Sequence, residues 1–210
     1  MSTLKHYYNQ WRVPIFIILV GLTLRIFAVV NNKTPYVNNY DTIRKVTLNF
    51  SDQKKTLSSS INNWTDADSL RKQLFTTSKA HPDFKALNKE LEASNHPPLY
   101  YYIYHPIKIW LDGGSHKLGS GYALNLILWF VGALIFYKLC VLVFQDENTA
   151  LMAFVFYATH LGSMTPIILL KAYVLQEVLV LLSVYLYFKY SKTEIANWRQ
   201  YVVYGLVIYL

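Results

Sequence analysis

The chain has 210 residues, enough for one domain or two small ones. Hydrophobic residues make up 53% of it and charged residues 15%, which excludes a disordered or collagen-like chain and argues against an ordinary soluble enzyme. The net charge of +8 would suit nucleic acid, but with this apolar content it indicates a membrane with anionic lipids instead. The single cysteine, Cys140, excludes a disulfide framework and a cysteine-based metal site.

The N-terminal region predicts a cytoplasmic tail followed by a membrane-spanning helix. Residues 1–12 are polar and basic, and residues 13–30 form an apolar run of 18 residues, about the minimum that crosses the hydrocarbon core. No small-residue cleavage site follows, so the run is not a signal peptide. Lys5 and Arg12 precede the run, and the positive-inside rule therefore predicts a cytoplasmic N-terminus.

Residues 31–96 predict a large, folded external loop. They contain ten Lys and Arg against seven Asp and Glu, but the positive-inside rule is weak for a loop of this length, 66 residues. Two stretches, residues 66–74 and 82–93, have the capped, amphipathic pattern of short helices. The loop is therefore more than a linker.

Two apolar segments follow the loop. Residues 97–111 are rich in Tyr but are interrupted by His105, Pro106 and Lys108, and they are too short to span, so we expect a helix along the outer membrane surface. Residues 121–144 are long enough to cross and predict the next transmembrane helix.

The last third of the chain predicts two more crossings. Residues 149–188 would measure about 60 Å as one helix, twice the hydrocarbon thickness, so they must fold back near Gly162 and Pro166. This gives transmembrane helices at 149–162 and 167–188. Residues 201–210 are apolar and too short to cross, and we expect the start of a truncated transmembrane helix there. The predicted fold class is an all-α polytopic membrane protein.

The sequence NHPPLYYYIYHPIKIW at 95–110 resembles the polyprenyl-phosphate-sugar-dependent transferases of glycosyltransferase family 39 and their bacterial relatives. LTLRIF at 22–27 resembles the end of that family's first span, and residues 163–189 resemble a later helix that usually begins with an Arg-x-Tyr pattern. The resemblance covers most of the chain in the family's order.

This resemblance implies the GT-C membrane fold and a glycosyltransferase that uses a polyprenyl- or dolichyl-phosphate sugar as donor. The acceptor would be a hydroxyl of a protein, glycan or lipid on the external or lumenal side; nucleic acid is not expected as a partner. The family has about a dozen spans, so the chain would hold the N-terminal part, and the enzyme assignment holds provided the C-terminal spans exist. The alternative is a non-catalytic fragment or lipid-binding membrane subunit of the same fold.

Asp41 is the candidate catalytic base. The family's acidic residue follows the first span within a short Asp-Glu element, and Asp41 is the first acid after Val30, although Thr42 stands where the second acid is expected. A base or orienting carboxylate is what an acceptor hydroxyl needs. Asp41 could equally cap a short helix, and Asp66 and Asp68 are rivals that look more like residues at a helix start.

His96 and Lys171 are the candidates for binding the donor phosphate. His96 opens the HPPLYY motif and could donate a hydrogen bond to the phosphate, or it could be a turn residue at the interface. Lys171 stands where relatives often carry Arg, and its ammonium could act as a point charge or extend to the outer surface.

Tyr100 and Tyr173 are the candidates for the substrate groove, whereas we expect the neighbouring tyrosines 101, 102 and 104 to be mostly interface anchors. Tyr173 shares a helix face with Glu177, and a glutamate inside a membrane is by default functional or paired. For Arg25, packing is favoured over a role in the site.

No metal site is expected from His or Cys spacing. The only cofactor that the sequence leaves open is a divalent cation held between a carboxylate and the donor phosphate. Three glycosylation sequons begin at Asn32, Asn49 and Asn63, but they do not decide the membrane. The Tyr-rich form of the motif favours a bacterial plasma membrane, with the endoplasmic reticulum as the alternative.

Overall fold

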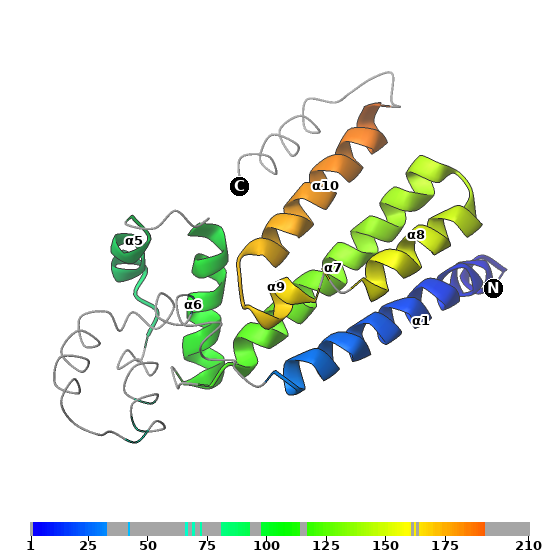
Figure 1. Cartoon of the computed structure of the whole chain (residues 1–210). Helices are drawn as coiled ribbons and strands as arrows, with labels where there is room; N and C mark the ends of the chain where they lie inside the picture. The colour runs from blue at the N-terminus through cyan, green and yellow to red at the C-terminus, as the bar shows by residue number, and fades with distance from the viewer. Residues whose placement is uncertain are drawn as a thin grey trace. The chain divides into compact units, whose positions relative to one another are not determined.

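The computed structural model describes residues 2–32, 42, 66, 69, 72, 81–92, 98–113, 117–160, 162 and 164–191, with the backbone alone for 2–10, 90 and 166. All regular structure within these residues is helical, which confirms the predicted all-helical class over this part of the chain (Figure 1). The helices are α1 (Ser2–Val30), α5 (Phe84–Glu92), α6 (Pro98–Asp112), α7 (Gly119–Phe144), α8 (Glu147–Thr159), α9 (Thr165–Ile168) and α10 (Tyr173–Ser191).

Three of the described helices are long and apolar enough to cross a membrane. They are the 20-residue part of α1 from Trp11 to Val30, α7 with 26 residues and α10 with 19 residues. At 1.5 Å per residue they measure about 30, 39 and 28 Å, which matches a hydrocarbon core of about 30 Å. The prediction of a membrane protein is thus supported by length and composition.

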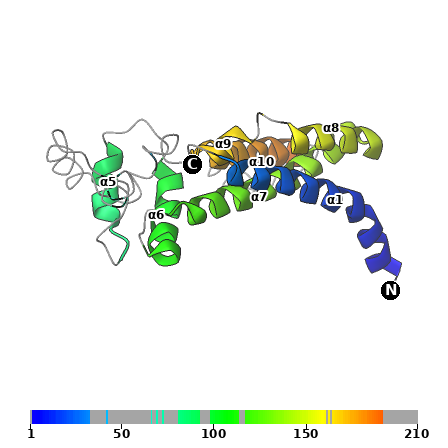
Figure 2. The ribbon, with the colours of Figure 1, turned by 60° about the horizontal axis from the view of Figure 1, so that its bottom comes forward.

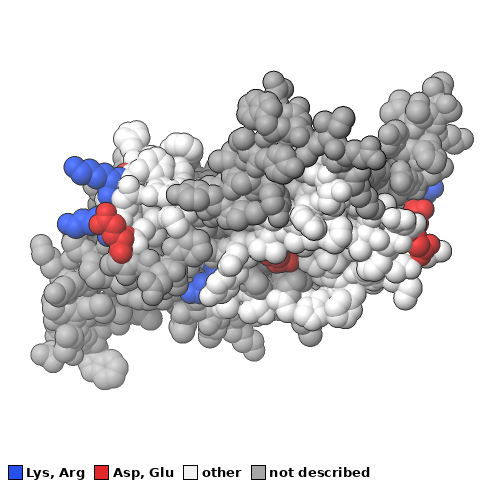
Figure 3. Space-filling view, turned by 90° about the horizontal axis from the view of Figure 1, so that it is seen from above, with Lys and Arg blue, Asp and Glu red and all other residues white. Residues whose placement is uncertain are grey.

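The outer surface of these helices is apolar. Phe16, Phe27 and Val30 of α1 are each about two-thirds exposed or more, at 66%, 68% and 76%. On the face drawn in Figure 3, most of the described surface is neutral and the charged side chains lie in a few separate groups. Such a surface suits lipid, since acyl chains offer no partner to a charge.

The described helices fall into two compact units. The first contains α1, most of α7, α8, α9 and α10, and the second contains α5, α6, the first turns of α7 and the turn 169–172. In the first unit α1 runs alongside α8 (Figure 1 and Figure 2). A Cβ on Gly21 would come within 2.8 Å of the Trp129 ring and 2.9 Å of the Ala158 carbonyl, so only glycine lets α1 approach this closely.

The chain breaks between α8 and α10, in the region where the sequence predicts a fold-back. Asp146 caps the N-terminus of α8, accepting hydrogen bonds from the backbone N–H of Thr149 at 2.7 Å and from its hydroxyl at 2.6 Å. The helix ends at Thr159, with His160 as its C-cap, earlier than the expected Gly162–Pro166 break. It has 13 residues, about 20 Å, and is shorter than the crossing expected at 149–162.

The following helix also begins later than the sequence indicates. Instead of a helix from residue 167, the short α9 ends at Ile168, and Leu170 then takes a left-handed conformation with φ of 44° before α10 starts at Tyr173. A non-glycine residue rarely adopts this conformation, and it interrupts the helical hydrogen-bond ladder. Residues 201–210 and the amphipathic stretch at 66–74, apart from single residues of the latter, lie outside the described part of the chain.

In the second unit, α5 packs against α6. The backbone N–H of Asp83 donates to Nε2 of the fully buried His105 at 3.0 Å, and the Asp83 carboxylate accepts from the N–H of Ala86 at 3.0 Å, capping α5. Tyr101 and Tyr104 are fully buried within the protein, so the expectation that they anchor the chain at the membrane interface is wrong. They are packing residues.

Candidate functional site

Three of the five residues expected from the sequence to form a site are described. Asp41 and His96 lie outside the described residues. Tyr100 has no exposed surface, and its ring packs against Tyr101 at 5.6 Å and Tyr104 at 5.9 Å between centroids.

Lys171 and Tyr173 lie near one another in the chain but in different settings. Lys171 is half-buried in the turn that precedes α10. Tyr173 is the first residue of α10 and is 55% exposed, so its ring is accessible to a ligand. Lys171 belongs to the second unit and Tyr173 to the first.

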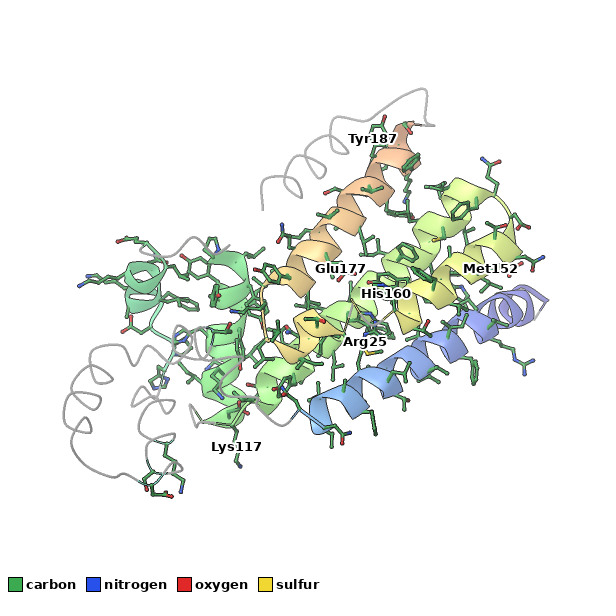
Figure 4. All side chains as sticks on the ribbon, in the orientation of Figure 1. Arg25, Lys117, Met152, His160, Glu177 and Tyr187 are labelled. Atoms are coloured by element: carbon green, nitrogen blue, oxygen red, sulfur yellow. The ribbon has the colours of Figure 1, made fainter. Side chains whose placement is uncertain are left out.

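The structure brings together a polar cluster that the sequence did not identify as such, and Arg25 is at its centre (Figure 4). Arg25 is fully buried, and its Nη1 donates to the carbonyl of Gly21 at 2.9 Å and to the carbonyl of Ala158 at 2.6 Å. Its guanidinium lies 3.8 Å from the centroid of the Trp129 ring. Two carbonyl acceptors and an aromatic face replace much of the hydration that a buried cation loses.

Glu177 supplies the opposite charge. Its carboxylate, half-buried on α10, acts electrostatically on Arg25 and on the hydroxyl of Tyr157. Tyr157 is held by stacking on Phe136, with ring centroids 4.4 Å apart and planes inclined by 18°. The cluster therefore joins a cation, an anion and a phenol from α1, α10 and α8 within one unit.

A cavity of about 410 Å³ opens beside this cluster. It is lined by Phe136, Phe156, Tyr157, His160, Gly162 and Glu177. This volume is within the range of small-ligand sites, about 300–1,000 Å³.

His160 contributes an imidazole to the cavity wall. Its Nδ1 accepts a hydrogen bond from the N–H of Gly162 at 3.1 Å, which in the neutral ring places the proton on Nε2 as a donor. The ring also packs on Phe156 with centroids 5.3 Å apart. With a carboxylate acceptor, an imidazole donor and aromatic faces, the cavity has the groups that bind a polyhydroxylated ligand.

A second buried charge lies in the other unit. Lys108 of α6 is fully buried and forms an ion pair with Asp112 at 2.8 Å, and it also donates to the Lys117 carbonyl. The Ser120 hydroxyl donates to the same Asp112 carboxylate at 2.6 Å. Burial lowers the pKa of Lys108, and the hydrogen bond and charge of Asp112 oppose that shift. This group joins α6 to the start of α7 and is structural.

The sequence analysis identified part of the polar cluster. Glu177 is marked by its place in an apolar run, and packing was the favoured role for Arg25, which agrees with its burial. Neither His160 nor Tyr157 was predicted to be a site residue. Among the described residues no group of three His, Cys, Asp or Glu side chains is placed to hold a metal ion.

No family model, curated protein or solved structure matches this chain. What the fold defines is an all-helical protein with three helices, among its described residues, that are long and apolar enough to cross a membrane.

Proposed function

We propose that this protein is a membrane glycosyltransferase of the GT-C type, which moves a sugar from a polyprenyl- or dolichyl-phosphate donor to an acceptor hydroxyl. The observation that carries the proposal is the HPPLYY sequence at 96–101, which follows an apolar helix and a long polar segment in the order of the family that it resembles. The apolar helices α1, α7 and α10 are in keeping with such a fold.

The cavity beside Glu177 supports the proposal. It lies at the end of α8 and near the start of α10, and the neighbouring Arg25 is close to the C-terminal end of α1. With a cytoplasmic N-terminus this end of α1 faces outward. A donor sugar bound here would meet Glu177, His160 and aromatic rings on the side of the membrane where the acceptor is found.

The proposed reaction is a single displacement with inversion at the anomeric carbon. Asp41 accepts the proton of the acceptor hydroxyl as its oxygen attacks that carbon. The new C–O bond forms as the bond from the carbon to the phosphate oxygen breaks, and the polyprenyl phosphate leaves with the electron pair. His96 and Lys171 bind the leaving phosphate and stabilise its developing charge, and Tyr173 lines the groove.

The test is the substitution Asp41→Asn, made in the protein's own gene and assayed in the membrane of its own host. Transfer of labelled sugar from the polyprenyl-phosphate donor is expected to fall by about a hundredfold or more, because general-base catalysis contributes about that much. Asp52→Asn, which removes a charge from the same segment, is the control and is expected to keep full activity. Equal activity of the Asp41→Asn protein, at equal abundance in the membrane, would exclude the assignment.

The alternative is a lipid-binding membrane subunit of the same fold that carries out no transfer. One observation favours it: Thr42 stands where the family that this chain resembles has its second acidic residue. Such a subunit would bind polyprenyl phosphate without consuming the sugar donor. Turnover of the donor by purified protein distinguishes the two functions.

For the location, the proposal is the bacterial plasma membrane, with the endoplasmic reticulum as the alternative. The acceptor is then an extracytoplasmic protein, glycan or lipid. Fractionation of the host's membranes tests the location, and assays with and without a chelator test whether a divalent cation takes part.

A further inference from the structure

A second cavity lies at the opposite end of the helices that form the first unit. It measures about 500 Å³ and is lined by the polar or aromatic side chains of Trp11, Tyr137, Lys138, Gln145 and Tyr185, together with two aliphatic residues of α7. Trp11 comes from α1, Tyr137 and Lys138 from α7 and Tyr185 from α10. The cavity is thus built by all three candidate membrane-spanning helices, and neither the sequence analysis nor the proposed function uses it.

The position of the cavity along the helices corresponds to a membrane interface. Trp11 is the first residue of the candidate span of α1, while α7 ends at Phe144 and α10 at Ser191. Tyr137 and Tyr185 lie six or seven residues before these ends, about 10 Å inward along the helices. The partly exposed rings of Trp11 and Tyr185 suit this level, where lipid headgroups meet the acyl chains.

The buried hydroxyl of Tyr137 indicates that the cavity binds a ligand. Tyr137 is only 3% exposed, and its ring is fixed between Trp11, at 5.4 Å, and Phe154, at 5.3 Å between centroids. Its hydroxyl has no hydrogen-bond partner among the described residues, although it belongs to a cavity-lining side chain. A buried hydroxyl without a hydrogen-bond partner destabilises the protein, and an acceptor inside the cavity would satisfy it.

Lys138 makes the cavity suitable for an anion. It is exposed, and it lies next to Tyr137 in the chain and in the cavity lining. Lys189 adds positive charge, lying 5.7 Å from the centroid of the Tyr185 ring. Two acidic residues of the described chain lie at this end. Asp146 accepts the hydrogen bonds that cap α8, and Glu147 interacts electrostatically with Tyr137 but accepts no hydrogen bond from its hydroxyl.

The rest of the lining is aliphatic. Val141 and Leu142 continue the cavity along α7 toward its end at Phe144, and Val141 is 37% exposed. A lipid from this leaflet would place its polar part in the cavity, against Tyr137 and Lys138, and its acyl chains would run from there toward the middle of the membrane, along the apolar outer surface of the helices.

We propose that this cavity binds the phosphodiester headgroup of a membrane glycerophospholipid. The Lys138 ammonium and the Tyr137 hydroxyl donate hydrogen bonds to the phosphate oxygens, Gln145 contributes an amide from the end of α7, and the acyl chains run from the cavity toward the middle of the membrane. With the predicted cytoplasmic N-terminus, the site takes lipid from the cytoplasmic leaflet. The inference does not depend on the proposed glycosyltransferase activity.

The test measures lipid binding by native mass spectrometry of the 210-residue chain in nonionic detergent. Dioleoyl phosphatidylglycerol is the probe, and dioleoylglycerol, which has the same acyl chains without the phosphate, is the matched ligand. The phospholipid is expected to bind at least about tenfold more tightly, because hydrogen bonds to a charged group are the stronger ones. Equal binding of the two lipids would overturn the proposal.

Two pairs of variants locate the site. Lys138→Gln and Tyr137→Phe are each expected to raise the Kd for phosphatidylglycerol about tenfold. Lys85→Gln and Tyr187→Phe make the same chemical changes at exposed positions of α5 and α10 and are expected to leave it unchanged. An unchanged Kd in the first pair, or an equal loss in the second, would overturn the proposal.

Two further arms complete the experiment. Tyr137→Phe keeps the buried ring, so the site can still be tested if Lys138→Gln fails to fold, and circular dichroism monitors the helices of each variant. Inorganic phosphate at the same concentration as the lipid is expected not to displace it. Displacement would identify a site for a free anion and would overturn the assignment to a lipid.

Discussion

The guanidinium of Arg25 lies against the ring of Trp129, 3.8 Å from its centroid, although 104 positions separate the two residues in the sequence. The same guanidinium donates to the carbonyl of Ala158 on a third helix. A single cation therefore holds α1, α7 and α8 together. The contact explains how an arginine can occupy an apolar helix, because the neighbouring helices supply an aromatic face and a carbonyl in place of water.

Removing Arg25 is expected to destabilise the bundle. Arg25→Ala should lower the free energy of unfolding by about 3 kcal/mol or more, because it removes a fully buried side chain with its hydrogen bond to the Ala158 carbonyl and its contact with the Trp129 ring, together with the charge that acts on Glu177. Glu177→Gln in the same chain should restore part of this loss. A double-mutant cycle, with denaturant unfolding in detergent micelles followed by circular dichroism, measures the coupling. Additive effects of the two substitutions would contradict the pairing.

Gly21 is expected to tolerate no side chain. Gly21→Ala should lower the free energy of unfolding by about 1–3 kcal/mol, because the new methyl group would come within 2.8 Å of the Trp129 ring and push α1 away from α8. Gly119→Ala is the control, since a Cβ there meets nothing within 4 Å. Thermal unfolding of the two variants under the same conditions should separate them clearly. Equal melting temperatures would show that α1 does not approach α8 this closely.

Asp146 should make stability depend on pH in the acid range. Hydrogen bonds from Thr149 hold the pKa of Asp146 below its ordinary value of 3.8, so its contribution is fully present above that value and is lost as the pH falls through the lower folded-state pKa. Asp146→Ser keeps a capping oxygen but cannot titrate. The variant should therefore have a shallower acid dependence of the melting temperature than the parent. A dependence that does not change would mean that other carboxylates account for it.

The buried pair in α6 should respond asymmetrically to substitution. Asp112→Ala should cost about 3 kcal/mol or more of unfolding free energy, because it leaves the Lys108 ammonium buried without its partner. The double substitution Lys108→Met, Asp112→Leu should cost less than Asp112→Ala alone. Chemical denaturation of the three proteins compares them. A double variant less stable than Asp112→Ala would show that the ion pair is worth more than its replacement by apolar packing.

The burial of Lys108 predicts that folding stability also depends on pH in the alkaline range. Burial lowers the pKa of Lys108 from its ordinary value of 10.5, so the unfolded chain binds this proton more tightly than the folded protein does. Stability should therefore rise with pH between the folded-state pKa and 10.5. Lys108→Met should remove this rise, which melting curves across that range would reveal. An identical rise in the variant would assign it to another group.

The helices themselves could be predicted because long apolar runs have few alternatives. Residues 13–30 and 121–144 are long enough to cross a membrane and contain few charges, and α1 and α7 cover both. The residues at which the helices end were harder to predict. The sequence favoured a break at Gly162 and Pro166, whereas α8 ends at Thr159 and the imidazole of the next residue, His160, accepts a hydrogen bond from the N–H of Gly162. A contact between a side chain and the backbone two residues away is not visible in a hydropathy pattern.

The pairing of polar side chains could not be predicted. Glu177 was recognisable as an unusual residue in an apolar run, but its relation to Arg25 and Tyr157 depends on how α1, α8 and α10 pack. The tyrosines of α6 illustrate the same limit. Their composition suggested a membrane interface, yet Tyr101 and Tyr104 are fully buried in the protein. Local sequence gives a residue's preference, and tertiary packing decides which neighbour satisfies it.

The hydrogen bond from Arg25 to the Ala158 carbonyl has a consequence for the order of assembly. Ala158 lies in the last turn of α8, where carbonyls lack a partner within the helix, so the arginine caps that helix from a distance of 133 positions in the chain. During synthesis α1 is made first, and its cation then has only the carbonyl of Gly21 in its own helix. The cap forms once the ribosome has released residue 158. Closure of this unit therefore follows synthesis of α8, and a chain stopped before that point leaves Arg25 without the carbonyl that links α1 to α8.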